Sequence, residues 1–217
     1  GIIVNWERSI RFGYSHFLHN KPVHVEFVTG NYSLMHLAEK SNARYHMQSG
    51  WIYDFAVKRF KKEAAEIRKS LGITEGCIVI ALFDELWGDH MLTKSRVEDF
   101  YKKFLLKTIE KPNYRLIIKP KKQTIISEMA AEISSLIREA ETLGRCVVLD
   151  SLQHVCMASM ASDISVALPS MAVFESILSG GRTLTLNYGR IYTELFYQHE
   201  GKGKIIFEDM HELIMAV

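Results

Sequence analysis

The sequence has few cysteines and no long apolar run, and these absences exclude several classes of protein. Its three cysteines, Cys77, Cys146 and Cys156, are odd in number and form no CxxC pair, which argues against a disulfide framework and a zinc site. No stretch approaches the roughly 18 to 20 consecutive apolar residues of a membrane-spanning helix, and the N-terminus has no signal-peptide pattern. We therefore expect a cytoplasmic protein whose thiols stay reduced.

An excess of charge of one sign is also missing. The chain carries 27 basic and 25 acidic residues, a formal net charge of +2, which gives no electrostatic reason for binding nucleic acid. We therefore expect no nucleic-acid partner. The nine histidines show neither HxxxH nor HxH spacing, so the sequence predicts no metal site.

What the sequence does contain is a regular alternation of strand-like and helix-like segments from Gly76 onward. Short apolar runs suit buried strands, and longer amphipathic stretches between them suit helices. Strands separated by such helices imply right-handed βαβ units, so we predict an α/β domain with a doubly wound parallel sheet. The predicted strands cover residues 76–83, 114–120, 145–150, 163–169, 182–188 and 203–209, and the predicted helices cover 95–111, 124–144, 154–161 and 171–181.

The first part of the chain has a different organisation. It opens in a strand-like run without a leading methionine, and the chain stops within a helical pattern, so we expect it to be part of a longer protein. We predict that residues 1–50 hold the end of an N-terminal domain and the crossing between domains, and that residues 51–217 form the second domain. The predicted elements are a strand at 23–30, a helix at 31–42, an extended piece at 43–55 and a helix at 56–72.

Ligands of open α/β sheets bind outside the carboxyl ends of the strands, here in the loops FDELWGDH, KPKK, DSLQH and PSMA. Ser170 falls at the start of the predicted helix 171–181, where free N–H groups and the helix dipole favour an anion such as a phosphate. Glu175 follows, and its carboxylate can accept hydrogen bonds from two ribose hydroxyls. A plain helix cap and a surface charge also explain these residues, and both interpretations stay open.

The order of elements around Ser170 is similar to the nucleotide-binding segment of the GT-B glycosyltransferase superfamily. In that segment an aspartate precedes a strand, a serine opens the next helix, a glutamate follows, and a glycine leads into the next strand. The resemblance implies that the second domain is the Rossmann-like C-terminal half of a GT-B enzyme, with a partial N-terminal segment before it. The matching residues are Asp163, Ser170, Glu175 and Gly181.

Residues 25–55 resemble the inter-domain crossing of bacterial surface-polysaccharide transferases and CDP-glycerol glycerophosphotransferases. In those enzymes a strand, a GxxS helix and a tGxPxxD segment lead into the C-terminal domain. Here GWIYD stands in place of the proline-containing turn, which removes one fixed turn. The residues at equivalent positions are Gly30, Ser33, Gly50 and Asp54.

The resemblance implies roles for six residues in binding an activated nucleotide. Lys119, which stands where many relatives have the histidine of a His-Pro pair, and the helix start at Ser170 and Met171 would neutralise the diphosphate. Glu175 would hold the ribose. Leu152 and Val155 would lie against the base. The resemblance implies no bound metal and no cofactor other than the nucleotide donor itself.

The implied activity is transfer of a sugar or a glycerophosphate-like group from a nucleotide donor to a glycan or lipid-linked acceptor at the cell surface. Asp84 and Glu85 are the candidate catalytic carboxylates, although an ordinary acidic loop explains them as well. A UDP-N-acetylglucosamine 2-epimerase and a non-catalytic nucleotide-binding module are the alternatives. The implied location is the cytoplasm, with peripheral association at the inner face of the cell membrane left open.

Overall fold

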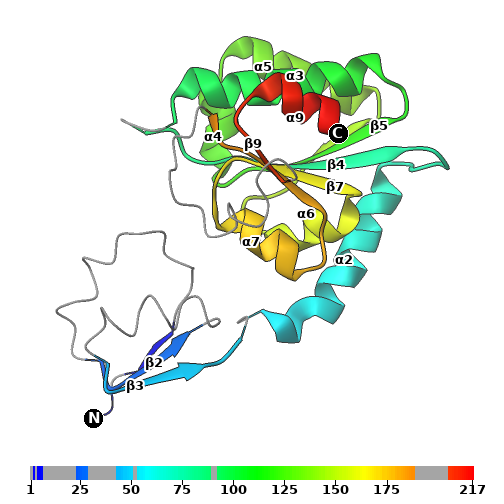
Figure 1. Ribbon diagram of the computed structural model, residues 1–217. Coiled ribbons are helices and arrows are strands. Elements are labelled where there is room, and N and C mark those ends of the chain that lie inside the picture. Colours follow the sequence, from blue (N-terminus) through cyan, green and yellow to red (C-terminus); the bar gives the residue numbers. More distant parts are fainter. Residues whose placement is uncertain are drawn as a thin grey trace. The chain divides into compact units, whose positions relative to one another are not determined.

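The computed structural model describes residues 2, 4–6, 23–28, 43–50, 53–88, 92–188 and 205–217 (Figure 1). The chain divides into two compact units, Gly1–Val57 and Lys58–Val217. The second unit contains every residue for which the sequence predicts a site.

The first unit contains a parallel sheet in the order β1-β2-β3. Strands β2 and β3 fall within the predicted strand 23–30 and the predicted extended piece 43–55, and the chain turns after β3 at Gly50, whose φ is +78°. The predicted helix 31–42, with Ser33, lies outside the described residues. The elements are β1 (Val4–Trp6), β2 (Val25–Val28), β3 (Tyr45–Gln48) and the short 3-10 helix η1 (Asp54–Ala56).

The second unit contains a parallel sheet of six strands in the order β6-β5-β4-β7-β8-β9. The predicted doubly wound α/β fold is therefore confirmed. Counted along the chain from β4, this is the Rossmann order 3-2-1-4-5-6, in which the connection reverses direction between β4 and β7. The strands are β4 (Ile78–Phe83), β5 (Tyr114–Lys119), β6 (Cys146–Val148), β7 (Ile164–Ala167), β8 (Thr183–Leu186) and β9 (Ile206–Phe207).

Helices cover both faces of this sheet. Helices α3, α5 and α9 lie on one face, and α6 and α7 lie on the other, with α2 alongside α6 (Figure 1). Among the described residues, no helix has the length and apolar character needed to cross a membrane. The helices are α2 (Val57–Ser70), α3 (Lys94–Glu110), α4 (Gln123–Glu128), α5 (Ala131–Thr142), α6 (Val155–Ala161), α7 (Met171–Leu178) and α9 (Met210–Ala216).

The structure corrects one predicted element, because residues 124–144 form two helices rather than one. Met129 and Ala130 are extended, with ψ values of 162° and 146°, and they separate α4 from α5. The Glu98 carboxylate of α3 accepts a hydrogen bond of 2.7 Å from the backbone N–H of Ala130 and so stabilises the break. Buried residues recur at helical spacing from Ile125 through Ile133, so the sequence pattern does not reveal the break.

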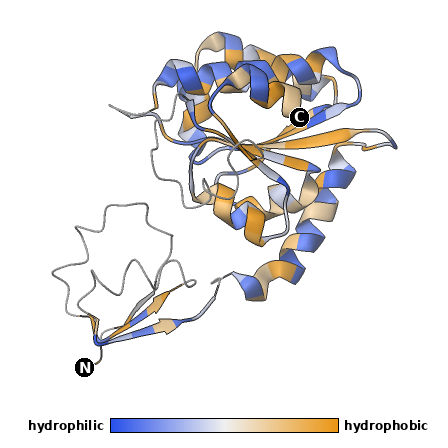
Figure 2. Ribbon diagram, viewed as in Figure 1, coloured by the Kyte–Doolittle hydropathy of each residue, from blue (hydrophilic) through white to orange (hydrophobic). Residues whose placement is uncertain are grey.

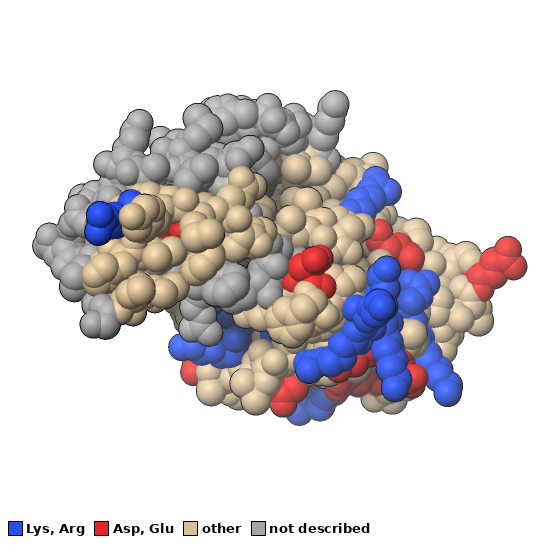
Figure 3. Space-filling view, turned by 90° about the horizontal axis from the view of Figure 1, so that it is seen from below, with Lys and Arg blue, Asp and Glu red and all other residues tan. Residues whose placement is uncertain are grey.

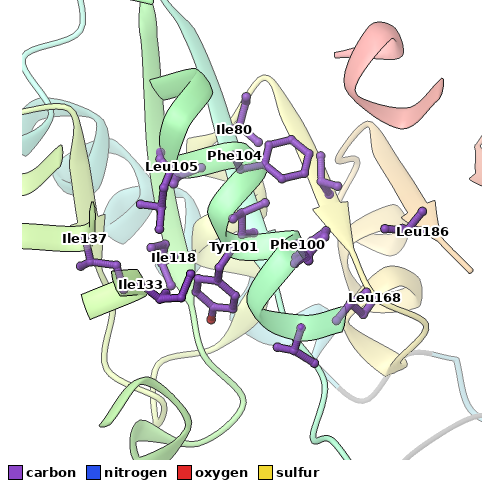
Figure 4. Packing of buried hydrophobic residues seen from close by; sticks show 14 of the residues in the cluster. Ile80, Phe100, Tyr101, Phe104, Leu105, Ile118, Ile133, Ile137, Leu168 and Leu186 are labelled. Carbon is purple, nitrogen blue, oxygen red and sulfur yellow. The ribbon is translucent and has the colours of Figure 1, made fainter. Parts of the chain in front are cut away.

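The face covered by α3, α5 and α9 holds the apolar core of the second unit. Phe100, Tyr101 and Phe104 of α3 are completely buried and lie against the sheet near Ile80 and Ile118 (Figure 4). Figure 2 shows the same pattern at the level of the chain, with hydrophobic strands between helices that have hydrophilic outer surfaces. This packing fixes the sheet whose carboxyl edge carries the candidate site.

On the face covered by α6 and α7, several small side chains with hydroxyl groups lie among the apolar residues. Ser159 of α6 and Ser176 of α7 lie 2.5 Å apart, and Thr183 of β8 donates to Ser176 at 2.7 Å. Ser165 of β7 donates to Ser159 at 3.3 Å. A Cβ on Gly181 would overlap the Ser159 Oγ, so the chain after α7 approaches α6 more closely than any other residue would allow.

Candidate functional site

The candidate site lies at the carboxyl ends of β4, β5, β6 and β7, all within the second unit. Asp84 directly follows β4, Lys119 ends β5, Leu152 belongs to the turn after β6, and Ser170 opens the helix after β7. The strand order reverses between β4 and β7, and doubly wound domains bind their ligands at the carboxyl edge beside such a reversal. The fold thus brings all four predicted loops to the same edge.

Lys119 connects two of these loops. Its side chain is largely buried, since the residue is 8% exposed. Its ammonium group donates hydrogen bonds of 2.9 Å to the carbonyl oxygen of Pro120 and 3.0 Å to that of Ser151. An ammonium group has three hydrogens, so one donor is left over within the part of the chain that the structure describes. Lys119 therefore ties the β5 and β6 loops together and keeps one N–H for a ligand.

The Lys119 ammonium also lies in the field of three carboxylates. Burial lowers the pKa of Lys119, whereas the three negative charges raise it. An amine that keeps its proton in such a buried position can stabilise a diphosphate without a metal ion. The three carboxylates belong to Asp84, Asp150 and Glu175.

Ser170 occupies the predicted position at the start of α7, but its side chain does not cap the helix. Its backbone is extended, and its hydroxyl accepts no hydrogen bond from the first turn. The Oγ atom is buried and has no hydrogen-bond partner among the described residues. Buried hydroxyls are nearly always hydrogen-bonded in native proteins, so this hydroxyl is an exception that a partner outside the described residues would explain. Met171, the first residue of α7, is half-buried beside it.

Glu175 lies one turn into α7, with its side chain 19% exposed. Burial raises the pKa of this carboxyl to about 7, and the charge of Lys119 opposes the shift. The carboxyl oxygens accept no hydrogen bond from the described residues, although the His154 Nε2 lies 3.9 Å from Oε1. Glu175 is thus a largely buried carboxyl group near Lys119, and among the described residues no donor occupies its oxygens.

The turn between β6 and α6 is held together by hydrogen bonds between its own residues. The Asp150 carboxylate accepts a 2.7 Å hydrogen bond from the N–H of Leu152, and the Gln153 side chain accepts one of 3.0 Å from the N–H of Asp150. Leu152 is 92% exposed, whereas Val155 is 8% exposed at the start of α6. Of the two residues expected to contact a base, Leu152 therefore presents a surface to a ligand and Val155 supports the loop from inside.

His154 lies beside the candidate site, with its Nε2 3.9 Å from the Oε1 of Glu175. It caps α6, because its Nδ1 accepts a 3.3 Å hydrogen bond from the N–H of Cys156. Its ring stacks on Phe60 of α2 at 4.7 Å. The capping position was visible in the sequence. The stacking partner was not, because it lies on a helix more than 90 residues earlier.

Asp84 and Glu85, the candidate catalytic carboxylates, are both engaged within the fold. Asp84 is 3% exposed and accepts hydrogen bonds of 2.7 Å from the Tyr101 hydroxyl and 2.6 Å from the N–H of Lys121. Burial raises the pKa of Asp84 to about 6, against the lowering effect of these two hydrogen bonds. Glu85 forms an ion pair with the Lys121 side chain. A role in catalysis requires either carboxylate to exchange these partners for a ligand.

Two other residues of the resemblance have structural positions away from the carboxyl edge. Asp163 precedes β7 and accepts a 2.8 Å hydrogen bond from the N–H of Val79, and it pairs with Arg68 of α2. Gly181 lies at the close contact with Ser159. Among the described residues, no group of three or more histidine, cysteine, aspartate or glutamate side chains is arranged to hold a metal ion.

No family model matches the chain, and no curated protein matches it as a relative. The fold is nevertheless similar to that of the wall teichoic acid polymerase TagF, with a TM-score of 0.58 and 14% identity over 89% of this chain and 47% of that one. A histidine-to-asparagine variant of TagF soaked with CDPG gives a TM-score of 0.64 and 13% identity, over 90% of this chain and 49% of that one.

This chain spans about half the length of the TagF structures that it matches. At such low identity the likeness concerns the fold, and it confirms the predicted Rossmann-like GT-B architecture. The match covers about nine tenths of this chain, so it extends beyond the parallel sheet of the second unit.

Proposed function

We propose that the carboxyl edge of β4, β5, β6 and β7 binds the nucleotide donor of a GT-B-type transferase. The observation that carries this proposal is the buried Ser170 hydroxyl, which has no partner among the described residues although it stands where the strand order reverses. A phosphate oxygen would supply the missing hydrogen-bond acceptor. The reaction we propose is transfer of a sugar or glycerophosphate-like group to a glycan or lipid-linked acceptor.

The residues around Ser170 support a diphosphate at this place. The first N–H groups of α7 have no partner within the helix, and the helix dipole adds positive potential there. The remaining N–H of Lys119 supplies a full positive charge. In this account the two sources of charge stabilise the leaving diphosphate, which is the group that becomes more negative as the transferred group departs.

The nucleoside would extend from the diphosphate along the same edge. Glu175 would accept hydrogen bonds from the ribose hydroxyls, and the exposed Leu152 would cover one face of the base. Asp84 and Glu85 would face the acceptor only after releasing Tyr101 and Lys121. We therefore expect residues other than Asp84 and Glu85 to activate the acceptor.

A panel of nucleotides tests the donor and its base together. Because TagF has been soaked with CDPG, we expect cytidine nucleotides to bind more tightly than the uridine, guanosine and adenosine nucleotides. At about 100 times its dissociation constant a ligand adds about 2.7 kcal/mol of stability, which a thermal-shift assay detects readily. A selective shift with one base would support the proposal, and the absence of any shift at millimolar concentration would contradict it.

A pair of helix-cap variants separates a ligand-binding serine from a structural one. Ser170→Ala should change the free energy of unfolding by less than about 0.5 kcal/mol, because its hydroxyl caps nothing, yet it should weaken nucleotide binding. The matched control is Asp209→Ala, since the Asp209 carboxylate accepts hydrogen bonds from two N–H groups of α9. That control should lose about 1 kcal/mol of stability and bind the nucleotide unchanged.

Two other functions of this fold give different results in one assay. A UDP-N-acetylglucosamine 2-epimerase would convert its sugar nucleotide without any acceptor, and analysis of the sugar product would reveal it. If the domain is a non-catalytic module, it would show the thermal shift with a nucleotide. The complete protein would then show no turnover even when an acceptor is present. A transferase should release its nucleotide only when an acceptor is present.

We also propose that α2 contributes to association with an anionic membrane surface, where a lipid-linked acceptor would lie. Six basic and two acidic side chains give this helix a net charge of +4, so the rest of the chain sums to −2. Figure 3 shows Lys and Arg side chains gathered on the side of the molecule along which α2 runs. The exposed basic residues are Lys58, Arg59, Lys61, Lys62 and Lys69.

Sedimentation with lipid vesicles tests this membrane contact. Vesicles containing phosphatidylglycerol should retain the protein at low salt and release it at high salt, and pure phosphatidylcholine vesicles should not retain it. Replacing Lys61 and Lys62 with Gln should weaken the retention, whereas replacing Lys102 and Lys103 of α3 in the same way should not. Equal effects of the two double variants would contradict a role for α2.

A further inference from the structure

His154 lies where three elements of the second unit meet beside Glu175. The residue follows β6 and caps α6, its ring stacks on Phe60 of α2, and its Nε2 faces the Glu175 carboxyl of α7. Its side chain is 18% exposed. The proposed function uses Glu175 to hold a ribose but gives His154 no part. The geometry around the ring indicates what that part is.

The hydrogen bond at Nδ1 determines which nitrogen of His154 carries the proton. Because Nδ1 accepts from the N–H of Cys156 at 3.3 Å, its lone pair is used and the ring hydrogen lies on Nε2. Burial, together with the charges of Lys119 and Arg59, lowers the pKa of His154 to about 4. At neutral pH the ring is therefore uncharged, and the nitrogen that carries its hydrogen lies 3.9 Å from the Glu175 Oε1.

Phe60 fixes the plane in which that donor lies. The two rings are 4.7 Å apart at an angle of 17°, and Phe60 is 2% exposed on the buried face of α2. The ring of His154 is thus held on one side by Phe60 and at Nδ1 by the start of α6. These contacts hold the ring with its Nε2 3.9 Å from the Oε1 of Glu175.

We propose that His154 is a positioning residue that orients the carboxyl group of Glu175 for the ribose. The Nε2 lies 3.9 Å from the Glu175 Oε1. A movement of about 1 Å brings the two atoms within hydrogen-bond distance. One carboxyl oxygen is then held by His154, and the other faces the ribose hydroxyls. This inference rests on the proposed nucleotide site and adds to it the residue that sets the direction of its ribose acceptor.

The two nitrogens of His154 can be tested separately, because two amides imitate them one at a time. In His154→Asn the side-chain oxygen stands near the position of Nδ1, so the cap on α6 is kept and the donor to Glu175 is lost. In His154→Gln the side-chain amide nitrogen stands near the position of Nε2, so the donor is kept and the cap is weakened. If His154 only caps α6, His154→Asn should bind the nucleotide better than His154→Gln. If His154 positions Glu175, the order should be reversed.

We expect His154→Asn to keep the melting temperature of the chain and to weaken binding of the best nucleotide of the panel about tenfold. His154→Gln should lower the melting temperature and bind within about twofold of the original chain. In the background of Glu175→Gln, the further change His154→Asn should alter the affinity by less than about twofold, since the two residues act through one contact. Additive effects, or affinity that follows the melting temperature in both variants, would overturn the inference.

A measurement without a ligand distinguishes failure of this inference from failure of the nucleotide site. The carbon-13 signal of the Glu175 carboxyl reports its titration, and a donor at Nε2 stabilises the ionised form. Since both variants remove the ring, they change the burial of Glu175 alike. The midpoint should lie about 0.5 to 1 pH unit higher in His154→Asn than in His154→Gln. Equal midpoints would overturn the inference, whether or not a nucleotide binds.

Discussion

The two faces of the six-stranded sheet are packed with different kinds of side chain. Towards α3, α5 and α9 the strands present large aliphatic residues such as Leu82, Ile118 and Val166, which meet the aromatic rings of α3. Towards α6 and α7 the strands bury apolar residues as well, but on this face Ser165 and Thr183 also join a network of hydroxyls. Both faces therefore stabilise the domain by burying apolar area, and the second face adds hydrogen bonds that connect α6 and α7 to the sheet.

The candidate site draws most of its residues from the face with the hydroxyl network. Helices on both faces begin at the carboxyl edge of the parallel sheet, and α6 and α7 bring Ser170, Glu175 and His154 there. Ser159, Ser176 and Thr183 are hydrogen-bonded inside this face, whereas the hydroxyls of Ser170 and Thr185 are bonded to no described residue. Of these two, Ser170 is the one that opens a helix at the carboxyl edge of the sheet.

The largest expected effect comes from the apolar face. Phe104→Ala should lower the free energy of unfolding by about 3 to 5 kcal/mol, because the ring is fully buried and its removal leaves a cavity. Urea denaturation measures this loss, and Phe55→Ala serves as the control because Phe55 is 86% exposed. Nucleotide affinity under native conditions should stay the same. A large fall in affinity would mean that the two faces do not have separate roles.

The close approach on the other face should be broken by Gly181→Ala. The added Cβ would overlap the Ser159 Oγ and lie 2.9 Å from the Ser176 carbonyl oxygen, so α7 must shift, at a cost of about 1 to 3 kcal/mol. Unlike Phe104→Ala, this change should weaken nucleotide binding as well, because α7 carries Ser170. Gly88→Ala is the control, since no atom lies within 4 Å of its added Cβ. Unchanged affinity in Gly181→Ala would show that the position of α7 does not matter for binding.

The smallest effect on stability has the opposite sign and belongs to the site. The pKa of Glu175 is about 7 in the folded chain and about 4.3 in the unfolded chain, so the folded state binds more protons between these values. Its contribution to stability therefore falls as the pH rises through this window. A glutamine does not ionise, so Glu175→Gln should not lose stability in this way. The variant should be about 1 to 2 kcal/mol more stable than the original chain at pH 8, and the difference should vanish near pH 4.

Urea titrations of both chains at several pH values measure this difference directly. The other buried carboxyl with a raised pKa, that of Asp84, titrates in both chains and cancels. The same substitution should weaken nucleotide binding, so the variant would be more stable and less functional. If the two chains lose stability in parallel from pH 4 to pH 8, Glu175 is not held in a buried position by the fold.

The strands were predictable from the sequence because each is a short apolar run buried on both faces. Residues 76–83 and 114–120 contain β4 and β5 for this reason. The break between α4 and α5 was not predictable, because Glu98 stabilises it from another helix while the apolar spacing continues through it. Patterns along the chain thus reveal which segments are buried, and contacts between distant segments decide where a helix ends.

In the candidate site, too, positions along the chain were predictable and contacts between distant segments were not. The loops could be located from the end of each predicted strand, and Ser170 stands at the expected start of a helix. The sequence did not show that its hydroxyl leaves the cap unmade, that two carbonyl oxygens hold Lys119, or that Phe60 stacks on His154. These features depend on the angles and distances between elements, which the periodicity of the sequence does not contain.

The most direct test of the nucleotide site is to follow the backbone amide signals of the chain by nuclear magnetic resonance while cytidine diphosphate is added. Our account predicts that the largest shifts occur at the start of α7, in residues 171–173, and in the loops at 119–122 and 150–155. The amides of α3 and α9 on the apolar face should stay unchanged. Shifts confined to α3 and α9, or no shift at millimolar nucleotide, would contradict a nucleotide site at the carboxyl edge of the sheet.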